Sequence, residues 1–439
     1  MEDEITASVV GVLFGLEGFR LLTAVEVAGE LELLVETTAD LVGCPDCGAV
    51  AAAKDRRPVW VRDLPIGGRP VVLCWYKRVW CCPHELCGVR TWTEQHAAIS
   101  PRMSLTERAQ QWAFEQVGDR DAAVAHVAGE LGVDWHTIMR VVTAKGAPVV
   151  DDPARLEHVA AIGVDETAFL RAARRHPTLF ATGVADLSPG RPARLLEVTE
   201  GRSGTVLADW LTRRDEGFTR QITTASLDPF RGYATALAAH IPDAIRVLDP
   251  FHVVKLGLSC VDEVRRRVQQ DSTGHRGRAG DPLYGIRRLL RRRVDRLSTR
   301  ARARLQAGLH AGDPAGEVTL AWTIAQDLMN LYRTDDPDKA RSTAAELITA
   351  ARDCPTKEIA RLGRTLAAWR DEFLAGLNHR QVSNGPTENL NLKIKHTKRI
   401  ARGFRNFTNY RLRLLLNHGR IRQNPLTPRI RTRRPSFVP

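Results

Sequence analysis

Residues 160–167 read AAIGVDET, an apolar segment of strand length that ends at an acidic side chain, Asp165. Residues 222–229, ITTASLDP, repeat this arrangement, because a second apolar segment ends at Asp228 and Pro229 then stops the strand. Short apolar segments of this kind are typical of strands buried within a sheet. The pattern therefore predicts two central strands, each of which carries a carboxylate at its end.

A third acidic residue, Glu388, lies in the segment SNGPTENLN at 383–391. Pro386 favours the start of a helix, which places Glu388 in its first turn. Two strands and one helix can bring together three carboxylates that are far apart in the sequence. Clustered carboxylates hold paired Mg²⁺ (or Mn²⁺) ions, which align a hydroxyl nucleophile with phosphorus and neutralise the leaving oxygen. We predict such a site here; the alternative is surface acids or helix caps, because the chain has 51 Asp and Glu residues.

The segments around these acids predict an α/β fold with a mixed five-stranded sheet. A helix is expected at Gly204–Arg213, and the strands are expected at Val159–Val164, Leu179–Val184, Arg194–Val198, Gln221–Leu227 and Ile245–Leu248. Residues 259–380 are rich in Ala, Leu and Arg with helical periodicity, which predicts an all-helical insertion. The expected divisions of the chain are 1–99, 100–150, 151–258, 259–380, a closing helical segment at 381–419 with a possible bend near Gly403, and a basic tail at 420–439.

The chain is strongly basic, with 439 residues, a net charge of +13 and a pI of about 9.7. This balance suits a polyanionic partner such as nucleic acid, although a basic protein of the ribosome or of a membrane surface has a similar charge. No apolar stretch of about 18 residues is present, so no membrane partner is expected. The acidic N-terminus argues against a signal peptide, and the sequence therefore predicts a cytoplasmic, nucleoid-associated protein.

Six of the eight cysteines fall between residues 44 and 87. In a reducing compartment such a cluster favours a metal site over disulfides. Cys44 and Cys47 form a CxxC pair, and Cys82 with Cys87 supplies a second pair; we prefer Cys82 to its neighbour Cys81 because it gives the more usual short loop. Four cysteine ligands around one Zn²⁺ would leave no open position, so the site would be structural, in a zinc ribbon with a strand pair at 59–64 and 71–79. The alternative is a set of buried thiols without metal.

Residues 121–146, DAAVAHVAGELGVDWHTIMRVVTAKG, predict a helix-turn-helix. Gly132 marks the turn, and Asp134 is suited to cap the second helix. The second helix would then present four side chains to the major groove of DNA, namely Trp135, His136, Thr137 and Arg140. The alternative is an ordinary helical hairpin within a linker.

Basic residues follow Glu388 at mostly helical spacing, and we expect them to contact the phosphates of DNA: Lys393, Lys395, Lys398, Arg399, Arg402 and Arg405. Residues 265–304 also contain 14 arginines. A solvated surface is the alternative for many of these arginines individually.

The chain resembles the ISL-three family of bacterial insertion-sequence transposases. The resemblance lies in CPxCG, RVWCCPHELCGVRTWTEQH, GVDET, SLDPFRGY, VLDPFHVVK and the segment 383–416 that begins SNGPTENLN. It implies an RNase H-like domain with a DDE triad, here Asp165, Asp228 and Glu388, and terminal inverted repeats bound by the finger and the helix-turn-helix. It further implies DNA-end cleavage and transfer of the 3′-hydroxyl ends to target DNA by two-metal chemistry, without a covalent protein–DNA intermediate. Both ends must be held together, so a homodimer or higher oligomer on double-stranded DNA is expected.

Asp249 and His252, in DPFH, resemble the D-x-x-H signature of several DDE superfamilies. His252 is therefore expected near the scissile phosphate, and the alternative is a structural pair at the end of a strand. For the chain as a whole, the alternative is a non-catalytic DNA-binding protein, such as a domesticated transposase that acts as a repressor.

Overall fold

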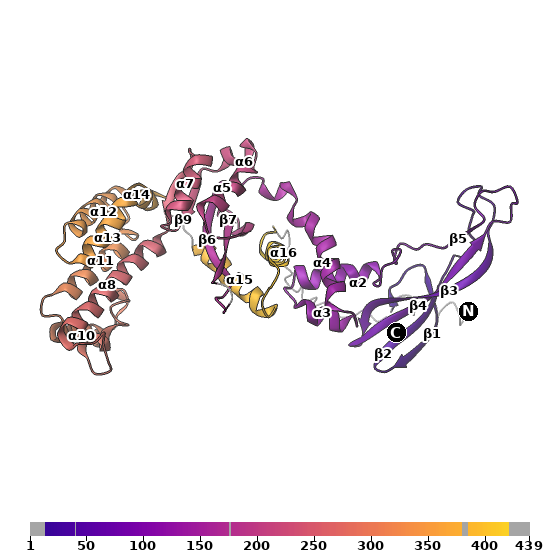
Figure 1. The fold of residues 1–439 in the computed structure, drawn as a ribbon, viewed down its shortest axis with the longest axis horizontal. Coiled ribbons are helices and arrows are strands. Elements are labelled where there is room, and N and C mark those ends of the chain that lie inside the picture. Colours follow the sequence, from indigo (N-terminus) through magenta and orange to yellow (C-terminus); the bar gives the residue numbers. More distant parts are fainter. Residues whose placement is uncertain (1–13, 40, 175–176, 380–384, 421–439) are drawn as a thin grey trace, which may run out of the picture. The chain divides into compact units, whose positions relative to one another are not determined.

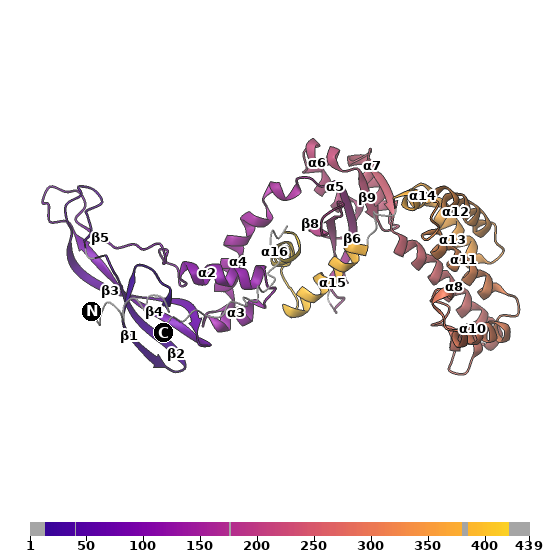
Figure 2. The same cartoon turned by 180° about the vertical axis from the view of Figure 1, so that it is seen from behind.

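The computed structural model of the protein describes residues 14–39, 41–174, 177–379 and 385–420 (Figures 1 and 2). The chain divides into two compact units. Unit 1 contains the described residues up to Asp152 together with His396–Asn417, and unit 2 contains Pro153–Lys395 with the described residues from His418 onward.

Unit 1 begins with a sheet of five strands in the order β1 (Phe19–Val27), β2 (Glu30–Thr37), β4 (Arg69–Cys81), β3 (Ala52–Ile66), with β5 (Thr91–Thr93) also paired to β4. The predicted strand pair is present as the long antiparallel hairpin β3–β4. Gly67 and Gly68 both adopt positive φ angles at its turn, a conformation that glycine reaches without strain. Alternate side chains of β4, including Val71, Leu73 and Trp75, are buried in the core of this sheet.

Three helices follow the sheet: α2 (Glu107–Gly118), α3 (Val124–Glu130) and α4 (Trp135–Val150). Gly132 adopts a φ of 63° between α3 and α4, and Asp134 accepts a hydrogen bond of 2.8 Å from the Thr137 backbone amide. The predicted turn glycine and cap are therefore both confirmed, and α3–α4 form the helix-turn-helix.

Unit 1 also takes in helix α16 (Phe407–His418) from the C-terminal region. A Cβ on Gly146 of α4 would lie 2.9 Å from Leu416, so the two helices approach closely at this glycine. The buried Arg413 donates to Asp121 Oδ1 at 3.1 Å. The structure therefore differs from the expected division at 381–419, because the apolar face of α16 is buried against α4.

Unit 2 contains the predicted mixed sheet, in the order β10 (Ile245–Leu248), β9 (Thr224–Leu227), β6 (Ala161–Leu170), β7 (Leu179–Asp186), β8 (Arg194–Glu200). The β6, β9 and β10 strands run parallel, and β7 runs antiparallel to both of its neighbours, β6 and β8. This order confirms the RNase H-like α/β fold. The helices beside the sheet are α5 (Gly204–Thr212), α6 (Glu216–Gln221) and α7 (Arg231–His240), and their core side chains include Leu207, Trp210 and Leu237.

The helical insertion begins with α8 (Pro250–Thr273), which starts directly after β10 and runs unbroken past the expected boundary at residue 259. The sheet and the insertion therefore share one helix. The remaining elements are α9 (Pro282–Ile286), the 3₁₀ turn η2 (Val294–Arg296), α10 (Thr299–Gly312), α11 (Glu317–Leu331), α12 (Pro337–Arg352), α13 (Lys357–Ala368) and α14 (Arg370–Asn378). Gly257 of α8 lets that helix approach Ala325 and Leu328 of α11.

Helix α15 (Gly385–Ile400) follows, and its residues up to Lys395 belong to unit 2. The chain then turns at Gly403, with a φ of 96°, before α16 begins, so the predicted bend is confirmed. Among the helices of the described residues, none combines the length and apolar character needed to cross a membrane.

Candidate active site and metal centre

Three acidic residues lie in one row of the unit 2 sheet, directly after the carboxyl ends of β9 and β10 and midway along β6. Val164 of β6 aligns with Leu227 of β9, and Leu227 aligns with Leu248 of β10. The next residue on each of these parallel strands is acidic: Asp165, Asp228 and Asp249. Ligands of open α/β sheets bind at the carboxyl ends of the strands.

Four of the predicted catalytic residues line one cavity of about 410 Å³ within unit 2: Asp165, Asp228, His252 and Glu388. Glu388 lies in the first turn of α15, as predicted. One turn later, the side-chain amide of Asn391 donates a hydrogen bond to Asp165 Oδ2 and so fastens α15 to the middle of β6, which continues to Leu170, past its expected end at Val164. The other residues that line the cavity are Glu166, Phe251, Lys255, Leu392 and Lys395.

Asp249 is 1% exposed and is not among the residues that line this cavity. It caps α8, and its Oδ2 lies 3.0 Å from His252 Nδ1. The same Nδ1 lies 2.9 Å from Asp228 Oδ1. The predicted Asp249–His252 pair is therefore present, and the imidazole of His252 contacts both Asp249 and Asp228 through its Nδ1. Asp249 is buried and orients the imidazole.

The charges of these side chains are coupled. Burial, and next the negative charge of Asp228, raise the pKa of Asp165 to about 7, although the Glu166 backbone amide, His252 and Asn391 act in the opposite direction. Burial lowers the pKa of His252, but hydrogen bonds to Asp228 and Asp249 outweigh it and raise that pKa to about 9. His252 is therefore a cation at neutral pH, and a further cation beside Asp165 and Asp228 would relieve their repulsion.

The four predicted zinc-binding cysteines lie together in unit 1. Sγ of Cys44 lies 3.7 Å from Sγ of Cys87, and Sγ of Cys47 lies 3.5 Å from Sγ of Cys82. Within the described part of the chain, they are the one group of three or more Cys, His, Asp or Glu side chains whose ligand atoms all lie within 4.8 Å of one another. The three carboxylates of the sheet cavity are therefore a less compact set than the thiols.

Each cysteine pair forms a tight loop that points backbone amides at sulfur. The amides of Cys47 and Asp46 hydrogen-bond to the Cys44 sulfur and lower its pKa to about 7, partly opposed by burial. Gly48 adopts a φ of 75°, and its amide bonds to the Cys44 carbonyl at 3.0 Å. Cys81 instead points its Sγ at the Ala52 carbonyl oxygen, 3.4 Å away, which explains why Cys82 and not Cys81 joins the group.

The predicted DNA-reading residues lie at the start of α4. Trp135, His136 and Arg140 are exposed. Thr137 is half-buried, and its hydroxyl donates to Asp134 Oδ2 at 3.0 Å, so this side chain contributes to the helix cap.

The basic residues after Glu388 lie in different surroundings. Lys395 lines the acidic cavity, whereas Lys393 and Arg399 are exposed on α15. Lys398 is half-buried, with its Nζ 6.0 Å from the centre of the Tyr410 ring. The last two, Arg402 and Arg405, line a second cavity, in unit 1.

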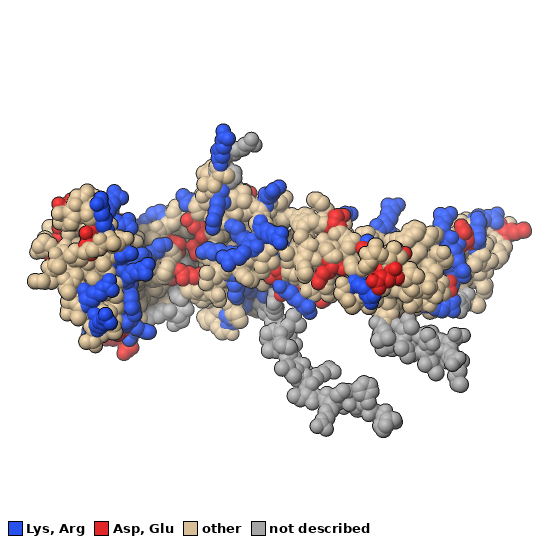
Figure 3. Space-filling view, turned by 90° about the horizontal axis from the view of Figure 1, so that it is seen from below, with Lys and Arg blue, Asp and Glu red and all other residues tan. Residues whose placement is uncertain are grey.

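The arginines of the insertion also divide into two groups. The side chain of Arg265 is buried beside Asp262, and Arg267 pairs with Glu317 and Glu358, so these arginines stabilise the helical bundle. Figure 3 shows many other Lys and Arg side chains gathered over the insertion.

The chain matches known families along most of its length. Residues 162–414 match the transposase family of the DDE ISL3 type, which is more than half of the chain. The chain belongs to the ISL3 family of transposases. Residues 94–144 match the helix-turn-helix domain of transposase family ISL3, and residues 40–87 match the zinc-finger of the IS204/IS1001/IS1096/IS1165 transposases. It is therefore a DDE-family transposase with a zinc-ribbon-type cysteine cluster and a DNA-binding helix-turn-helix.

Two curated transposases are similar to this chain. The chain is 27% identical over 384 residues to the transposase for insertion sequence element IS1001 of Bordetella parapertussis. The aligned region covers 85% of this chain and 88% of the relative. It is 26% identical over 296 residues to the transposase for insertion sequence element IS1557 of Mycobacterium tuberculosis (strain CDC 1551 / Oshkosh). This aligned region covers 62% of this chain and 63% of the relative.

Two side chains of this ISL3 transposase site were not assigned to it from the sequence. Asn391 lies three residues after Glu388, which places both on one helical face, and its amide holds Asp165. Lys255 stands three residues after His252 in α8 and lines the same cavity.

Proposed function

We propose that this transposase binds the terminal inverted repeats of its insertion sequence, cleaves the DNA at the element ends and joins the freed 3′-hydroxyl ends to target DNA. The observation that carries the proposal is the meeting of Asp165, Asp228 and Glu388 at one cavity, with the two aspartates in one row of the sheet. The three residues lie far apart in the sequence, so only the folded chain brings them to one cavity.

The residues of the cavity fit divalent cations. Carboxylate oxygens are the ligands that Mg²⁺ and Mn²⁺ prefer, and a cation would favour the ionised form of Asp165, whose pKa is raised by burial and by the charge of Asp228. We propose Asp165, Asp228 and Glu388 as the protein ligands. When bound, such ions lower the pKa of a hydroxyl nucleophile and neutralise the leaving oxygen.

The neighbouring side chains orient and hold the reacting groups. Asn391 fixes the direction of the Asp165 carboxylate through its amide hydrogen bond. Asp249 and Asp228 keep His252 protonated, which places a positive charge where it would face a scissile phosphate. The ammonium groups of Lys255 and Lys395 line the cavity and would hold phosphate oxygens.

The reaction then needs two exchanges of phosphodiester bonds. Water attacks phosphorus at the element end, the bond to the 3′ oxygen breaks, and that oxygen leaves with a proton as a 3′-hydroxyl. This hydroxyl next attacks a phosphorus of the target strand, and the target's own 3′ oxygen leaves. Because the attacking oxygen belongs to water in the first step and to the DNA 3′-hydroxyl in the second, and not to a side chain, no covalent bond between protein and DNA forms.

The N-terminal modules would recognise the element ends. We propose that Cys44, Cys47, Cys82 and Cys87 bind Zn²⁺, which would join the two cysteine loops without an open position for catalysis. Helix α4 would place Trp135, His136 and Arg140 in the major groove, with Lys393, Lys398 and Arg399 at phosphates. Two copies of the chain would hold the two ends.

The test is cleavage of supercoiled DNA that carries the sequence flanking the gene. The wild-type protein should nick this DNA at the element ends when Mg²⁺ or Mn²⁺ is added, and Asp165→Asn and Glu388→Gln should bind the ends without nicking them. Nicking by either variant would remove that residue from the site. Binding of the ends by the wild-type protein without any nicking would favour the alternative function, a non-catalytic repressor.

A further inference from the structure

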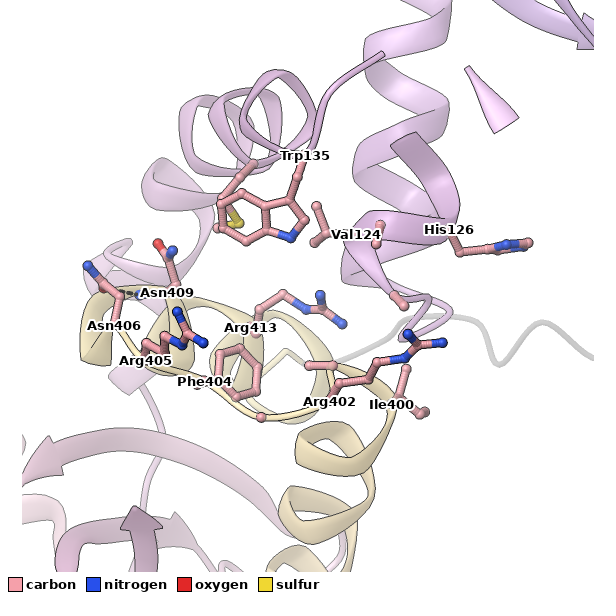
Figure 4. Close-up of a pocket in the computed structure, with 15 residues that line it drawn as sticks. Val124, His126, Trp135, Ile400, Arg402, Phe404, Arg405, Asn406, Asn409 and Arg413 are labelled. Carbon is pink, nitrogen blue, oxygen red and sulfur yellow. Dashed lines mark hydrogen bonds between the residues drawn. The ribbon is translucent and has the colours of Figure 1, made fainter. Parts of the chain in front are cut away.

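A second cavity, of about 540 Å³, lies within unit 1 beside the helix-turn-helix. It is bounded by the first turns of α3 and α4 and by the residues that connect α15 to α16 (Figure 4). Its size is within the range of about 300–1,000 Å³ that is typical of small-molecule sites. None of the residues proposed for catalysis lines it.

Two aromatic side chains face the cavity from opposite sides. Trp135, the first residue of α4, is 40% exposed, and Figure 4 places it across from Phe404. The Phe404 ring contacts the buried Tyr410 ring, with centroids 5.3 Å apart, which holds it in place. Val124 and Met139 are buried and add apolar surface. The cavity therefore offers flat faces for a planar ring.

The polar lining of the cavity is entirely basic or neutral. None of its 15 lining residues, all of them described, carries a carboxylate, whereas Arg402, Arg405, Arg413 and His126 are basic. An anionic ligand is therefore favoured.

Arg413 supplies an independent sign of a ligand. It is 1% exposed, and its Nη2 donates to Asp121 Oδ1 and to the Ala122 carbonyl, both at 3.1 Å. Its Nε has no hydrogen-bond partner within the described part of the chain. A buried donor without a partner is destabilising, so an acceptor that enters the cavity and reaches this atom would be stabilised. In Figure 4 the Arg413 side chain lies between Trp135 and Phe404.

We propose that this cavity receives a single nucleotide that is unstacked from the DNA duplex bound by the helix-turn-helix. This inference rests on the proposed function, because the duplex must be bound through α4. The base would stack on Trp135 and Phe404, and the exposed Arg402 and Arg405 would hold its phosphate. The amides of Asn406 and Asn409, which also line the cavity, would meet the edge of the base.

The first experiment scans the bound DNA with single abasic sites. Each duplex is taken from the flanking region that the protein protects in footprinting, and its affinity is measured for the wild type and for Trp135→Ala. On intact DNA the variant should bind roughly 5- to 150-fold more weakly, which corresponds to the loss of one stacking contact. On the duplex that lacks the unstacked base, the same variant should bind as well as the wild type.

Trp60→Ala is the matched control, because Trp60 is 63% exposed in the N-terminal sheet and does not line the cavity. Its effect should not depend on the position of the abasic site. Phe404→Leu should reproduce the position dependence of Trp135→Ala, and Trp135→Phe should restore most of the affinity. Circular dichroism of each variant verifies that its helices are intact.

An equal loss of affinity by Trp135→Ala on every duplex would overturn the inference, because Trp135 would then contact DNA without receiving a base. Tryptophan fluorescence can also test whether free dAMP binds without DNA. If dAMP binding depends on Trp135 and the affinity for duplexes does not depend on the position of the abasic site, the inference is overturned in favour of a small-molecule site. Either result leaves the proposed function standing. Failure of the wild type to bind any flanking duplex would instead contradict the proposed function as well.

Discussion

Asn391 donates a hydrogen bond from its side-chain amide to Oδ2 of Asp165, a residue that precedes it by 226 positions. The bond joins the first turns of α15 to the middle of β6. It fixes a carboxylate whose ionisation is opposed by burial and by the charge of Asp228. Asn391 is therefore a positioning residue, and its removal tests the site without removing a proposed ligand.

Asn391→Ala should lower the rate of end cleavage by about 10- to 100-fold, the usual effect of losing a group that orients a metal ligand. It should also raise the Mg²⁺ concentration needed for half-maximal cleavage, since Asp165 would be held less firmly. Asn389→Ala is the control, because Asn389 is exposed on the same helix and does not line the cavity. Equal Mg²⁺ dependence in the two variants would contradict the assigned role.

Asp228→Asn should reduce Mg²⁺-dependent nicking by on the order of 10³-fold or more, while the affinity for end DNA stays near that of the wild type. The amide keeps the size of the side chain but loses the charge that would hold a cation. Asp243→Asn, at an exposed residue of the same unit, should nick normally. If the Asp228 variant nicks as fast as the Asp243 variant, the triad is wrong.

Cys82→Ser should release zinc, whereas Cys81→Ser should retain about one zinc ion per chain. The two residues are neighbours, but only the Cys82 sulfur points at the other thiols. Zinc content after gel filtration, measured by a colorimetric chelator, separates the two variants. Loss of metal from both, or from neither, would argue against the ligand set.

Gly204→Ala should destabilise unit 2. Gly204 begins α5, and a Cβ there would lie 2.8 Å from Cα of Gly232 in α7 and closer still to its carbonyl oxygen. Overpacking of this kind typically lowers the free energy of unfolding by about 1–3 kcal/mol.

The urea midpoint of the unit 2 transition measures this effect. Gly285→Ala is the control, because the nearest heavy atom to its added Cβ, Arg304 Nη2, is 4.0 Å away, and alanine favours a helix. A midpoint for Gly204→Ala equal to that of the wild type would show that α5 and α7 can move apart.

Much of the fold follows from local pattern. The apolar segments before Asp165 and Asp228 can satisfy their backbone only as buried strands, so the starts of β6 and β9 were predictable to within three residues, whereas β6 continues to Leu170, six residues past its expected end at Val164. The cysteine spacing and the Gly132–Asp134 turn were equally informative, because tight loops and helix caps depend on neighbours in the sequence. The predicted domain boundaries do not follow in this way, since α8 runs unbroken from the sheet into the insertion.

Sequence pattern alone identifies the apolar segments, the acidic residues that follow them, the tight loops and the apolar helix faces. Tertiary structure alone decided that Val164, Leu227 and Leu248 align so that three aspartates form a row, that α16 packs on α4, and that Trp135 and Phe404 face one cavity. Local pattern fixes the apolar face of an element, whereas strand register and the choice of partner depend on hydrogen bonds and packing between segments tens to hundreds of residues apart.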